Sequence, residues 1–452
     1  MANSYLSRSE SSAGSSTKGT LSAWLKRSKI TSEYPRIFSS YIDNSNHWKV
    51  YFDNTDRLNV YGEAGGSLTN QVITTRKFKD TDAFYHIVVA VDSTQGSSSD
   101  RVKVYVNGVQ ETAFDTATYP SSSANMKFNG GSGNTDTIGK KEGASSDYFN
   151  GYMSHVSWVD GAALAPTSFG STDATSGMWK FKAPSGITWG TNGVHLKFEN
   201  SGSLGLDSSG ETNNFTVNGS LKQSIDTPSN NFITMNVLDN QNQASTFTMA
   251  NTKIEWNTSN KTNFGAWSMN KGKWYWELKY ADNTGGANLM TGIVRDPTGI
   301  GSRDPSDWPG HDNNGFSYYA ANGSKYYNGS GSSYGNSFTT NDIVGVAFNA
   351  DTRTLWFSKN GTWQNSATIS EIAAGTTTNS AWTGIGSASN EWFPATSGYD
   401  GNKAEFNFGN GYFSTTPVSS AGTSSTGDDS VWEYDCPTGF YGLNTKNLNT
   451  YG

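Results

Sequence analysis

Short runs of alternating apolar and polar residues recur along almost the whole chain, and this pattern constrains the fold more than any other feature. Clear examples are TLSAWLK at 20–26, YHIVVAVDS at 85–93 and KGKWYWELKYA at 271–281. A period of two residues is typical of β-strands that bury one face. No segment sustains the 3.6-residue period of an amphipathic helix. The sequence therefore predicts an all-β protein of antiparallel, jelly-roll-type β-sandwiches with very little helix.

Turn residues separate these runs. Asn107-Gly108 lies within RVKVYVNGVQ, and Asn360-Gly361 follows TLWFSK. Asn and Gly both adopt the positive φ angles that a two-residue hairpin turn requires, so each dipeptide predicts a tight turn. We also expect a short helical turn at 166–169.

The length and the aromatic content favour two domains in series. The chain has 452 residues, of which 13% are aromatic and 16% are charged. Aromatic side chains supply the buried area that two cores need. The strand pattern is weakest over 171–225. We predict a polar N-terminal segment at 1–18, a first sandwich at 19–225, a linker at 226–245, a second sandwich at 246–416, and a flexible linker with a C-terminal tail at 417–452.

Charge and cysteine content exclude several classes of protein. The 32 basic and 39 acidic residues give a net charge of −7, and no cluster of Lys or Arg provides the footprint of a nucleic-acid binder. Cys436 is the single cysteine, so an intrachain disulfide cannot form. Neither a signal peptide nor an apolar run of membrane-spanning length is present. We expect a protein made in a reducing cytoplasm, with no nucleic-acid partner and no membrane insertion.

Two sets of motifs resemble known domains. The stretch FYHIVVAVDSTQGSSSDRVKVYVNGVQ at 84–110, with YFNGYMSHVSWVDGAALAPTSFG at 148–170, resembles the laminin-G-like, concanavalin A-type lectin sandwich. The blocks KGKWYWELKY at 271–280, DIVGVAFNADTRTLWFSKNG at 342–361 and WFPATSGYDGNKAEFNFG at 392–409 resemble the SPRY domain. These resemblances imply a lectin-type module followed by a SPRY-like module.

The arrangement of the whole chain resembles structural or tail-fibre-like proteins of tailed marine phages, including those that infect cyanobacteria and other oceanic bacteria. This resemblance implies a location in the virion and contact with other virion proteins. It also implies a tail-fibre, appendage or decoration role in which the protein binds a host-surface glycan or receptor protein, and it suggests a homotrimer. The alternative is a purely structural subunit that packs against other capsid or tail proteins.

A catalytic role has no supporting motif. Some concanavalin-type sandwiches are glycosidases with a Glu-x-Asp-x-x-Glu spacing, and this chain has none. Glu277 and Glu405 lack a carboxylate two residues away, so we expect solvent-facing or hairpin-pairing charges. Histidines 47, 86, 155, 195 and 311 form no zinc-binding motif or close pairing, and Cys436 has no neighbouring base. We expect a protein that is not an enzyme, and glycan hydrolysis is the weakest alternative.

The segment 295–315 is the most informative for ligand binding. It is a long, irregular stretch rich in Asp, Asn and Gly, and long loops on rigid sandwiches often carry function. Sugars bind to aromatic faces beside amide and carboxylate groups. The predicted ligand-binding residues are Trp308, Asp312, Asn313, Tyr326 and Tyr327. The alternative is that Trp308 plugs the end of the sandwich.

Calcium is the single cofactor that the sequence leaves open. Laminin-G-like modules sometimes bind this ion through loop aspartates. Asp43, Asp53, Asp56 and Asp92 lie at predicted loops or strand ends, where ordinary turn chemistry explains them equally well. Most other tryptophans fall in strand patterns and are predicted to be core residues: Trp24, Trp48, Trp158, Trp274, Trp276 and Trp356.

Overall fold

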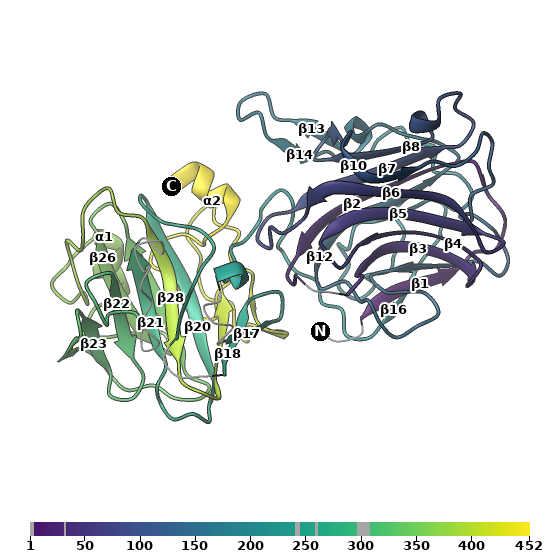
Figure 1. Ribbon diagram of the computed structural model, residues 1–452. Coiled ribbons are helices and arrows are strands. Elements are labelled where there is room, and N and C mark those ends of the chain that lie inside the picture. The colour runs from purple at the N-terminus through teal and green to yellow at the C-terminus, as the bar shows by residue number, and fades with distance from the viewer. Residues whose placement is uncertain (1–3, 31–32, 240–244, 258–260, 296–307) are drawn as a thin grey trace. The chain divides into compact units, whose positions relative to one another are not determined.

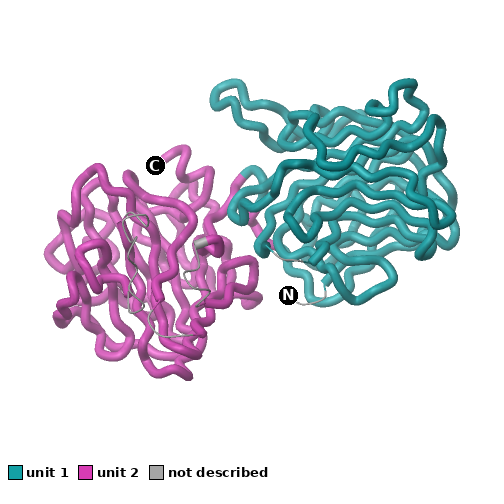
Figure 2. Tube along the Cα trace, viewed as in Figure 1, with its two compact units in different colours: residues 1–223, 227–229 teal, residues 224–226, 230–452 magenta. Residues whose placement is uncertain are grey.

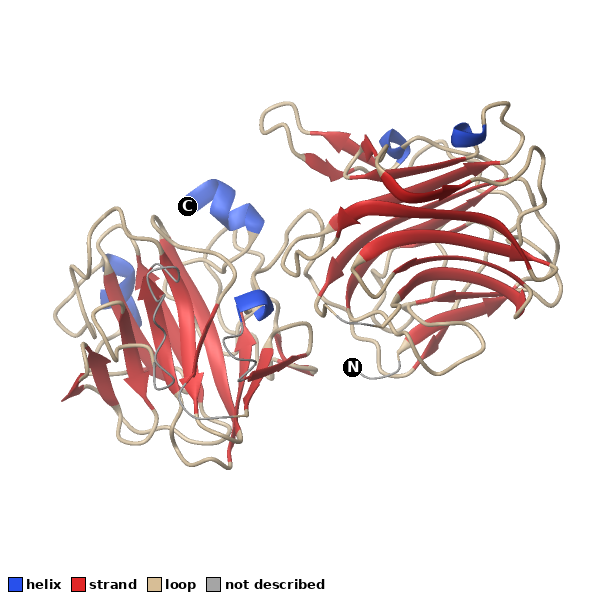
Figure 3. Ribbon diagram, viewed as in Figure 1, coloured by secondary structure: helices blue, strands red, loops and turns tan. Residues whose placement is uncertain are grey.

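The structure is a computed structural model that describes residues 4–30, 33–239, 245–257, 261–295 and 308–452 (Figure 1). Strands make up 43% of the chain and helices 5%, which confirms the all-β prediction (Figure 3). The chain divides into two compact units (Figure 2). Unit 1 contains residues 1–223 and 227–229, and unit 2 contains residues 224–226 and 230–452. Within the described residues, no helix is long and apolar enough to cross a membrane.

Unit 1 is a sandwich of two antiparallel sheets. The larger sheet has the order β10 (Phe114–Thr118), β6 (Ser67–Lys77), β5 (Arg57–Ala64), β4 (Asn46–Phe52), β3 (Arg36–Asp43), β11 (Thr135–Ile138), β1 (Tyr5–Ser9) and β16 (Thr216–Asn218). The smaller sheet has the order β15 (Val194–Leu196), β12 (Gly151–Asp160), β2 (Lys18–Arg27), β7 (Tyr85–Asp92), β8 (Val102–Val106) and β9 (Val109–Gln110). A short 3-10 helix, η1 (Ser98–Asp100), precedes β8.

Alternation along the strands places one face of each sheet in the core of unit 1. Trp48 of β4 and Trp158 of β12 meet there with ring centroids 5.6 Å apart, and Phe38 of β3 stacks on Trp158 at 5.2 Å. These aromatic contacts join residues of both sheets. The six tryptophans that the pattern assigned to cores are all at most 3% exposed, which confirms that prediction.

The polar N-terminal segment is part of the sandwich. Strand β1 pairs with β11 on one side and β16 on the other. The buried guanidinium of Arg8 contacts the carboxylate of Asp136 at 2.7 Å. This ion pair compensates the charge of Arg8, a residue type that would be expected at the surface from composition alone. The expectation of a separate segment at 1–18 is therefore wrong for β1.

Residues 162–193, which we call the cap, cover the outer face of the smaller sheet of unit 1. The first helix or strand of the cap is the 3-10 helix η2 (Pro166–Ser168), which is the helical turn predicted from the sequence. A hairpin of β13 (Gly170–Thr172) and β14 (Trp179–Phe181) follows it. Phe169 of the cap is buried against Val88 and Val159 of the sheet. The strand pattern is weak here because the cap packs through isolated aromatic residues between polar turns.

Unit 2 is a second antiparallel sandwich. Its larger sheet has the order β17 (Ser245–Thr248), β18 (Lys253–Trp256), β29 (Asn402–Asn407), β20 (Lys273–Asn283), β25 (Ile343–Asn349), β26 (Thr354–Lys359) and β27 (Thr362–Trp363). The other sheet has the order β19 (Lys261–Phe264), β28 (Trp392–Gly398), β21 (Met290–Arg295), β22 (Gly315–Tyr319), β23 (Ser324–Tyr327) and β24 (Ser330–Ser333). The remaining elements are η3 (Val237–Asp239), α1 (Ile369–Ala374), β30 (Tyr412–Phe413), β31 (Thr416–Pro417) and α2 (Thr445–Tyr451).

The predicted hairpin turns are confirmed in both units. Asn107 and Gly108 have φ angles of 48° and 81° between β8 and β9. Asn360 and Gly361 have φ angles of 48° and 78° between β26 and β27. Both turns therefore use the left-handed conformations that Asn and Gly adopt most readily.

Described parts of both segments predicted as linkers instead pack into unit 2. Phe232 and Ile233, within the expected linker at 226–245, are each 1% exposed. Trp432 and Phe440, within the expected flexible tail at 417–452, are fully buried and form a cluster with Tyr275 on the outer side of β20. Only a few apolar residues make these contacts. The Gly- and Ser-rich sequence around them therefore looks like a flexible linker.

Glu277 anchors the C-terminal segment. The expectation that this residue faces solvent is wrong, because its side chain is fully buried in β20. Its carboxylate accepts hydrogen bonds from the backbone N–H groups of Glu433 and Tyr434, both at 2.9 Å, and from Nδ2 of Asn407 at 3.0 Å. Burial raises the pKa of Glu277 to about 7 against the opposing effect of these donors. Glu405 pairs with Lys253 at 2.8 Å, between strands β29 and β18, which do not form a hairpin.

Candidate functional site

The predicted ligand-binding residues lie around β22 and β23 of unit 2. Phe316 and Tyr318 of β22 face the core, so Ser317 and Tyr319 face outward. Tyr326 of β23 pairs with Ser317 and shares this outer face. The part of the predicted loop at 296–307 lies outside the described residues.

Three aromatic rings form a continuous surface on this outer face. The rings of Trp308 and Tyr326 are nearly perpendicular, with centroids 5.3 Å apart, and Tyr326 meets Tyr319 in the same way at 5.7 Å. Trp308 also contacts His311 at 5.3 Å. The Ser317 hydroxyl donates a hydrogen bond to the Pro309 carbonyl and so holds the end of the loop against β22. We call Trp308, Tyr319 and Tyr326 the aromatic surface.

Tyr327 does not belong to the aromatic surface. Its ring stacks on Phe316 with centroids 4.5 Å apart and planes 7° apart, on the core-facing side of β22. Consecutive residues of a strand point to opposite faces, so Tyr326 and Tyr327 cannot contact one compact ligand together. The prediction that Tyr326 and Tyr327 share one site with Trp308 is therefore wrong for Tyr327. The sequence alone could have separated them, whereas Tyr319 was missed although it lies on a recognisable strand.

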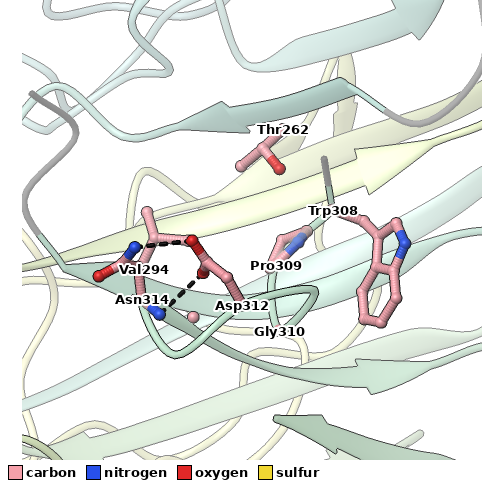
Figure 4. A pocket seen from close by; sticks show the side chains of 8 residues that line it. Thr262, Val294, Trp308, Pro309, Gly310, Asp312 and Asn314 are labelled. Atoms are coloured by element: carbon pink, nitrogen blue, oxygen red, sulfur yellow. Dashed lines mark hydrogen bonds between the residues drawn. The ribbon is translucent and has the colours of Figure 1, made fainter. Parts of the chain in front are cut away.

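The two polar candidates have different roles. The Asp312 carboxylate accepts hydrogen bonds from the backbone N–H and the side-chain amide of Asn314, at 2.8 and 2.7 Å, so it shapes its own turn (Figure 4). Asn313 is exposed, and its Oδ1 lies 3.4 Å from a guanidinium nitrogen of Arg295. Arg295 also donates to Oδ1 of Asn314 at 3.0 Å. Asn313 is therefore the polar candidate whose side chain is freer to meet a ligand.

A cavity beside the aromatic surface is too small for a sugar. It is lined by Trp308, Pro309, Gly310 and Asp312 together with Thr262, Val294, Asn314 and Gly315, and it holds about 10 Å³ (Figure 4). That volume approaches the roughly 10–15 Å³ that one water molecule needs. A glycan would therefore bind on the rings and not inside the cavity. Trp308 is half-buried, and its ring contacts Tyr326 and His311.

The four aspartates considered for calcium do not form one site. Asp43 and Asp53 lie at opposite ends of β4, which at about 3.3 Å per residue separates them by roughly 20 Å. Asp53 bonds Thr55 and Arg57 in its own turn. The remaining two aspartates also have partners: Asp56 pairs with Arg27 at 2.9 Å, and Asp92, in the other sheet, accepts from Thr94 and Gln95. Across the described part of the chain, no three His, Cys, Asp or Glu residues form a metal-binding group.

The structure also brings together histidines that the sequence keeps far apart. His86, His155 and His195 all lie beneath the cap. His155 Nδ1 is 3.3 Å from His195 Nε2, although 40 residues separate them along the chain. Burial lowers the pKa of His86 to about 3 and those of His155 and His195 to about 4. A spacing of 40 residues matches no local motif, so this pair could not be predicted from the sequence.

Comparison with known families finds one matching region in each unit. Residues 1–168 match the concanavalin A-like lectin/glucanases superfamily, and residues 273–411 match the SPRY domain. The chain joins a concanavalin A-like domain to a SPRY domain. The aromatic surface lies within the SPRY match, whereas most of the cap lies beyond the residues of the concanavalin A-like match. No curated protein matches the chain.

Several solved structures resemble parts of the chain. The SPRY domain of human HERC1 is 20% identical, covering 34% of this chain and 87% of that one, with a TM-score of 0.26. The TRIM65 PSpry domain is 11% identical, covering 39% and 91%, with a TM-score of 0.29. A SAP-like pentraxin from Limulus polyphemus is 17% identical, covering 36% and 71%, with a TM-score of 0.27.

Proposed function

We propose that this protein is a non-catalytic virion protein of the tail-fibre, appendage or decoration type, and that it binds a host-surface glycan or receptor protein. Concanavalin A-like and SPRY domains are typically binding modules. The virion location, the contact with other virion proteins and a homotrimeric state rest on the resemblance to proteins of tailed marine phages.

The aromatic surface is the observation that carries the binding proposal. It combines rings held rigidly on β22 and β23 with the half-buried Trp308 and the exposed amide of Asn313. Rigid aromatic rings next to a few polar groups provide a large contact area at a small entropic cost. Because the adjacent cavity is so small, the surface suits a ligand that lies across the rings, such as a segment of surface polysaccharide.

The carboxylates considered for catalysis support a non-catalytic role. A glycosidase needs two carboxyl groups that face one another across the scissile bond. Glu277 is buried beneath the C-terminal segment, and Glu405 is paired with Lys253. Neither is therefore available to a polysaccharide as one member of such a pair.

Binding to an array of bacterial surface glycans and to cyanobacterial and other marine bacterial cells tests the proposal. Full-length protein should bind at least one glycan or cell type, without releasing reducing ends from it. If soluble, folded protein binds none of them, the rival role of a purely structural virion subunit is favoured. Release of reducing ends would instead establish glycan hydrolysis. Locating the chain in a density map of the virion tests the location separately.

A further inference from the structure

Strand β24 is a free edge of a sheet in unit 2. It pairs with β23 on one side and is the last strand of its sheet. All four of its residues, which read Ser-Gly-Ser-Ser, are exposed. The free side of an edge strand presents backbone N–H and C=O groups with which another strand can pair.

The hairpin of β23 and β24 determines which backbone groups point outward. Asn328 and Gly329, with φ angles of 50° and 71°, form the two-residue turn between the strands. The two residues that flank such a turn exchange hydrogen bonds, and bonded and non-bonded pairs alternate beyond them. The N–H and C=O groups of Gly331 and Ser333 therefore point away from β23. Within the part of the chain that the structure describes, no other backbone group bonds to them.

The hairpin is held in place at its turn. The Asn328 N–H donates a hydrogen bond to the Asp312 carbonyl at 3.0 Å, and the Gly329 N–H donates one to the Gly310 carbonyl at 2.9 Å. These bonds tie the turn to the segment that follows Trp308. Because β24 is already ordered, this protein would lose little conformational entropy when another strand binds to it.

The other strands at the edges of the four larger sheets have features that hinder strand addition. Strand β10 has a bulge between Phe114 and Thr116. Strands β9 and β27 have two residues each, and β15 and β16 have three. Strands β17 and β19 contain buried residues. Since short length, charge, proline and bulges protect natural edges, the regular and uncharged β24 is the least protected of these described edges.

The free edge is continuous with the aromatic surface. Tyr326 is paired with Gly331 across the hairpin, and a Cβ atom at Gly331 would lie 2.7 Å from Cζ of the Tyr326 ring. The glycine therefore lets this ring lie across β24 on the outer face of the sheet. A residue opposite Gly331 on an added strand would point to the same face. Its side chain would contact the Tyr326 ring.

We propose that β24 binds an extended polypeptide segment of a partner protein, which adds to the sheet as a further strand. A polypeptide fits this edge because outward N–H and C=O groups recur about every 7 Å along a strand, and another strand presents matching groups at the same spacing. The backbone bonds provide affinity, and the Tyr326 ring selects the side chain opposite Gly331. This inference rests on the proposed function and deepens it, because it names the part of a receptor protein that the SPRY domain contacts.

Selection of a random dodecapeptide library against the full-length protein tests this edge. Ser333→Pro removes the outward N–H of Ser333 and should weaken binding of the selected peptides by at least about tenfold. Ser333→Ala is the matched control, because it keeps the N–H group and should bind the peptides like the wild type. Hydrogen exchange of the Gly331 and Ser333 amides should slow when a peptide binds, because both amides then donate hydrogen bonds.

The proposal is overturned if the library yields no binding peptide, or if the selected peptides bind folded Ser333→Pro as tightly as Ser333→Ala. Unchanged exchange of both amides in the wild type would overturn it as well, and this measurement decides the question if Ser333→Pro does not fold. Self-association in light scattering that Ser333→Pro abolishes would instead show that a second copy of the chain occupies the edge. Glycan and cell binding are measured on the same protein, so their absence, and not the absence of peptide binding, counts against the proposed function.

Discussion

The indole N–H of Trp179 donates a 2.9 Å hydrogen bond to Nδ1 of His86. Nδ1 must be unprotonated to accept this bond, and the Ser22 hydroxyl lies 2.9 Å from the other ring nitrogen. The cap is therefore joined to the sheet through a histidine that has to remain neutral. This contact links the stability of unit 1 to pH.

We predict that unit 1 loses stability in acid. Burial lowers the pKa of His86 to about 3, whereas histidine in an unfolded chain titrates near 6.5. The unfolded chain thus takes up a proton that the folded chain excludes, so stability is retained above pH 6.5 and falls as the pH drops toward 3. His155 and His195 act in the same direction.

Urea unfolding between pH 7 and pH 4 measures this effect. Wild-type unit 1 should lose a few kcal/mol over that range. His86→Gln should be less stable at pH 7 but show a shallower dependence on pH, since two titrating histidines remain. Equal slopes in the variant and the wild type would contradict the role given to His86.

Glu277→Gln should destabilise unit 2 by about 2–3 kcal/mol. The amide cannot accept on both of its terminal atoms, so at least one buried donor among Glu433 N–H, Tyr434 N–H and Asn407 loses its partner. Hydrogen exchange of the backbone amides of Glu433 and Tyr434 should also accelerate.

Glu405→Gln on β29 is the control for this substitution. Its ion pair with Lys253 lies near the surface and contributes less than about 1 kcal/mol. If the two variants unfold at the same denaturant concentration, the C-terminal segment is not held by Glu277.

Gly108→Ala should cost more stability than Gly65→Ala. Both glycines have positive φ angles, 81° and 59°, which an alanine adopts at a cost of about 1 kcal/mol. A Cβ atom at Gly108 would lie 2.4 Å from the Trp179 ring, whereas one at Gly65 meets nothing within 4 Å. We expect an additional loss of about 1–3 kcal/mol in chemical denaturation for Gly108→Ala alone. Equal losses would mean that the hairpin does not support the cap.

Calcium should not stabilise unit 1. Asp53, Asp56 and Asp92 already bind neighbouring side chains, and Asp43 accepts from the Ser45 N–H and Asn46 in an exposed turn. The melting temperature should therefore be the same with a chelator and with calcium up to seawater concentration. A rise that saturates with calcium would show that some of these carboxylates form a binding site.

Strand periodicity predicted the parts of the fold that depend on local pattern. The hairpins at Asn107 and Asn360 and the buried tryptophans follow from turn chemistry and from alternation. The cap and the C-terminal segment were missed because each packs through a few isolated residues, such as Phe169 and Trp432, and through hydrogen bonds to distant groups. Such packing leaves no periodic signal.

Only part of the candidate site could be predicted, because the rest also depends on contacts between distant residues. Residue type identified Trp308 and Tyr326, which do meet, but the face of the strand excludes Tyr327. The contact of His155 with His195 depends on which strands are neighbours, since β12 pairs with β15. Local sequence does not encode this pairing.

Affinity for the best-bound glycan or cell type tests the binding account most directly, with Trp308→Ala compared against Tyr327→Ala. Both variants should remain folded, because both side chains are partly exposed. We predict that Trp308→Ala weakens binding by at least about tenfold, as the loss of a central aromatic contact does, whereas Tyr327→Ala binds like the wild type. Unchanged binding by folded Trp308→Ala would contradict the account.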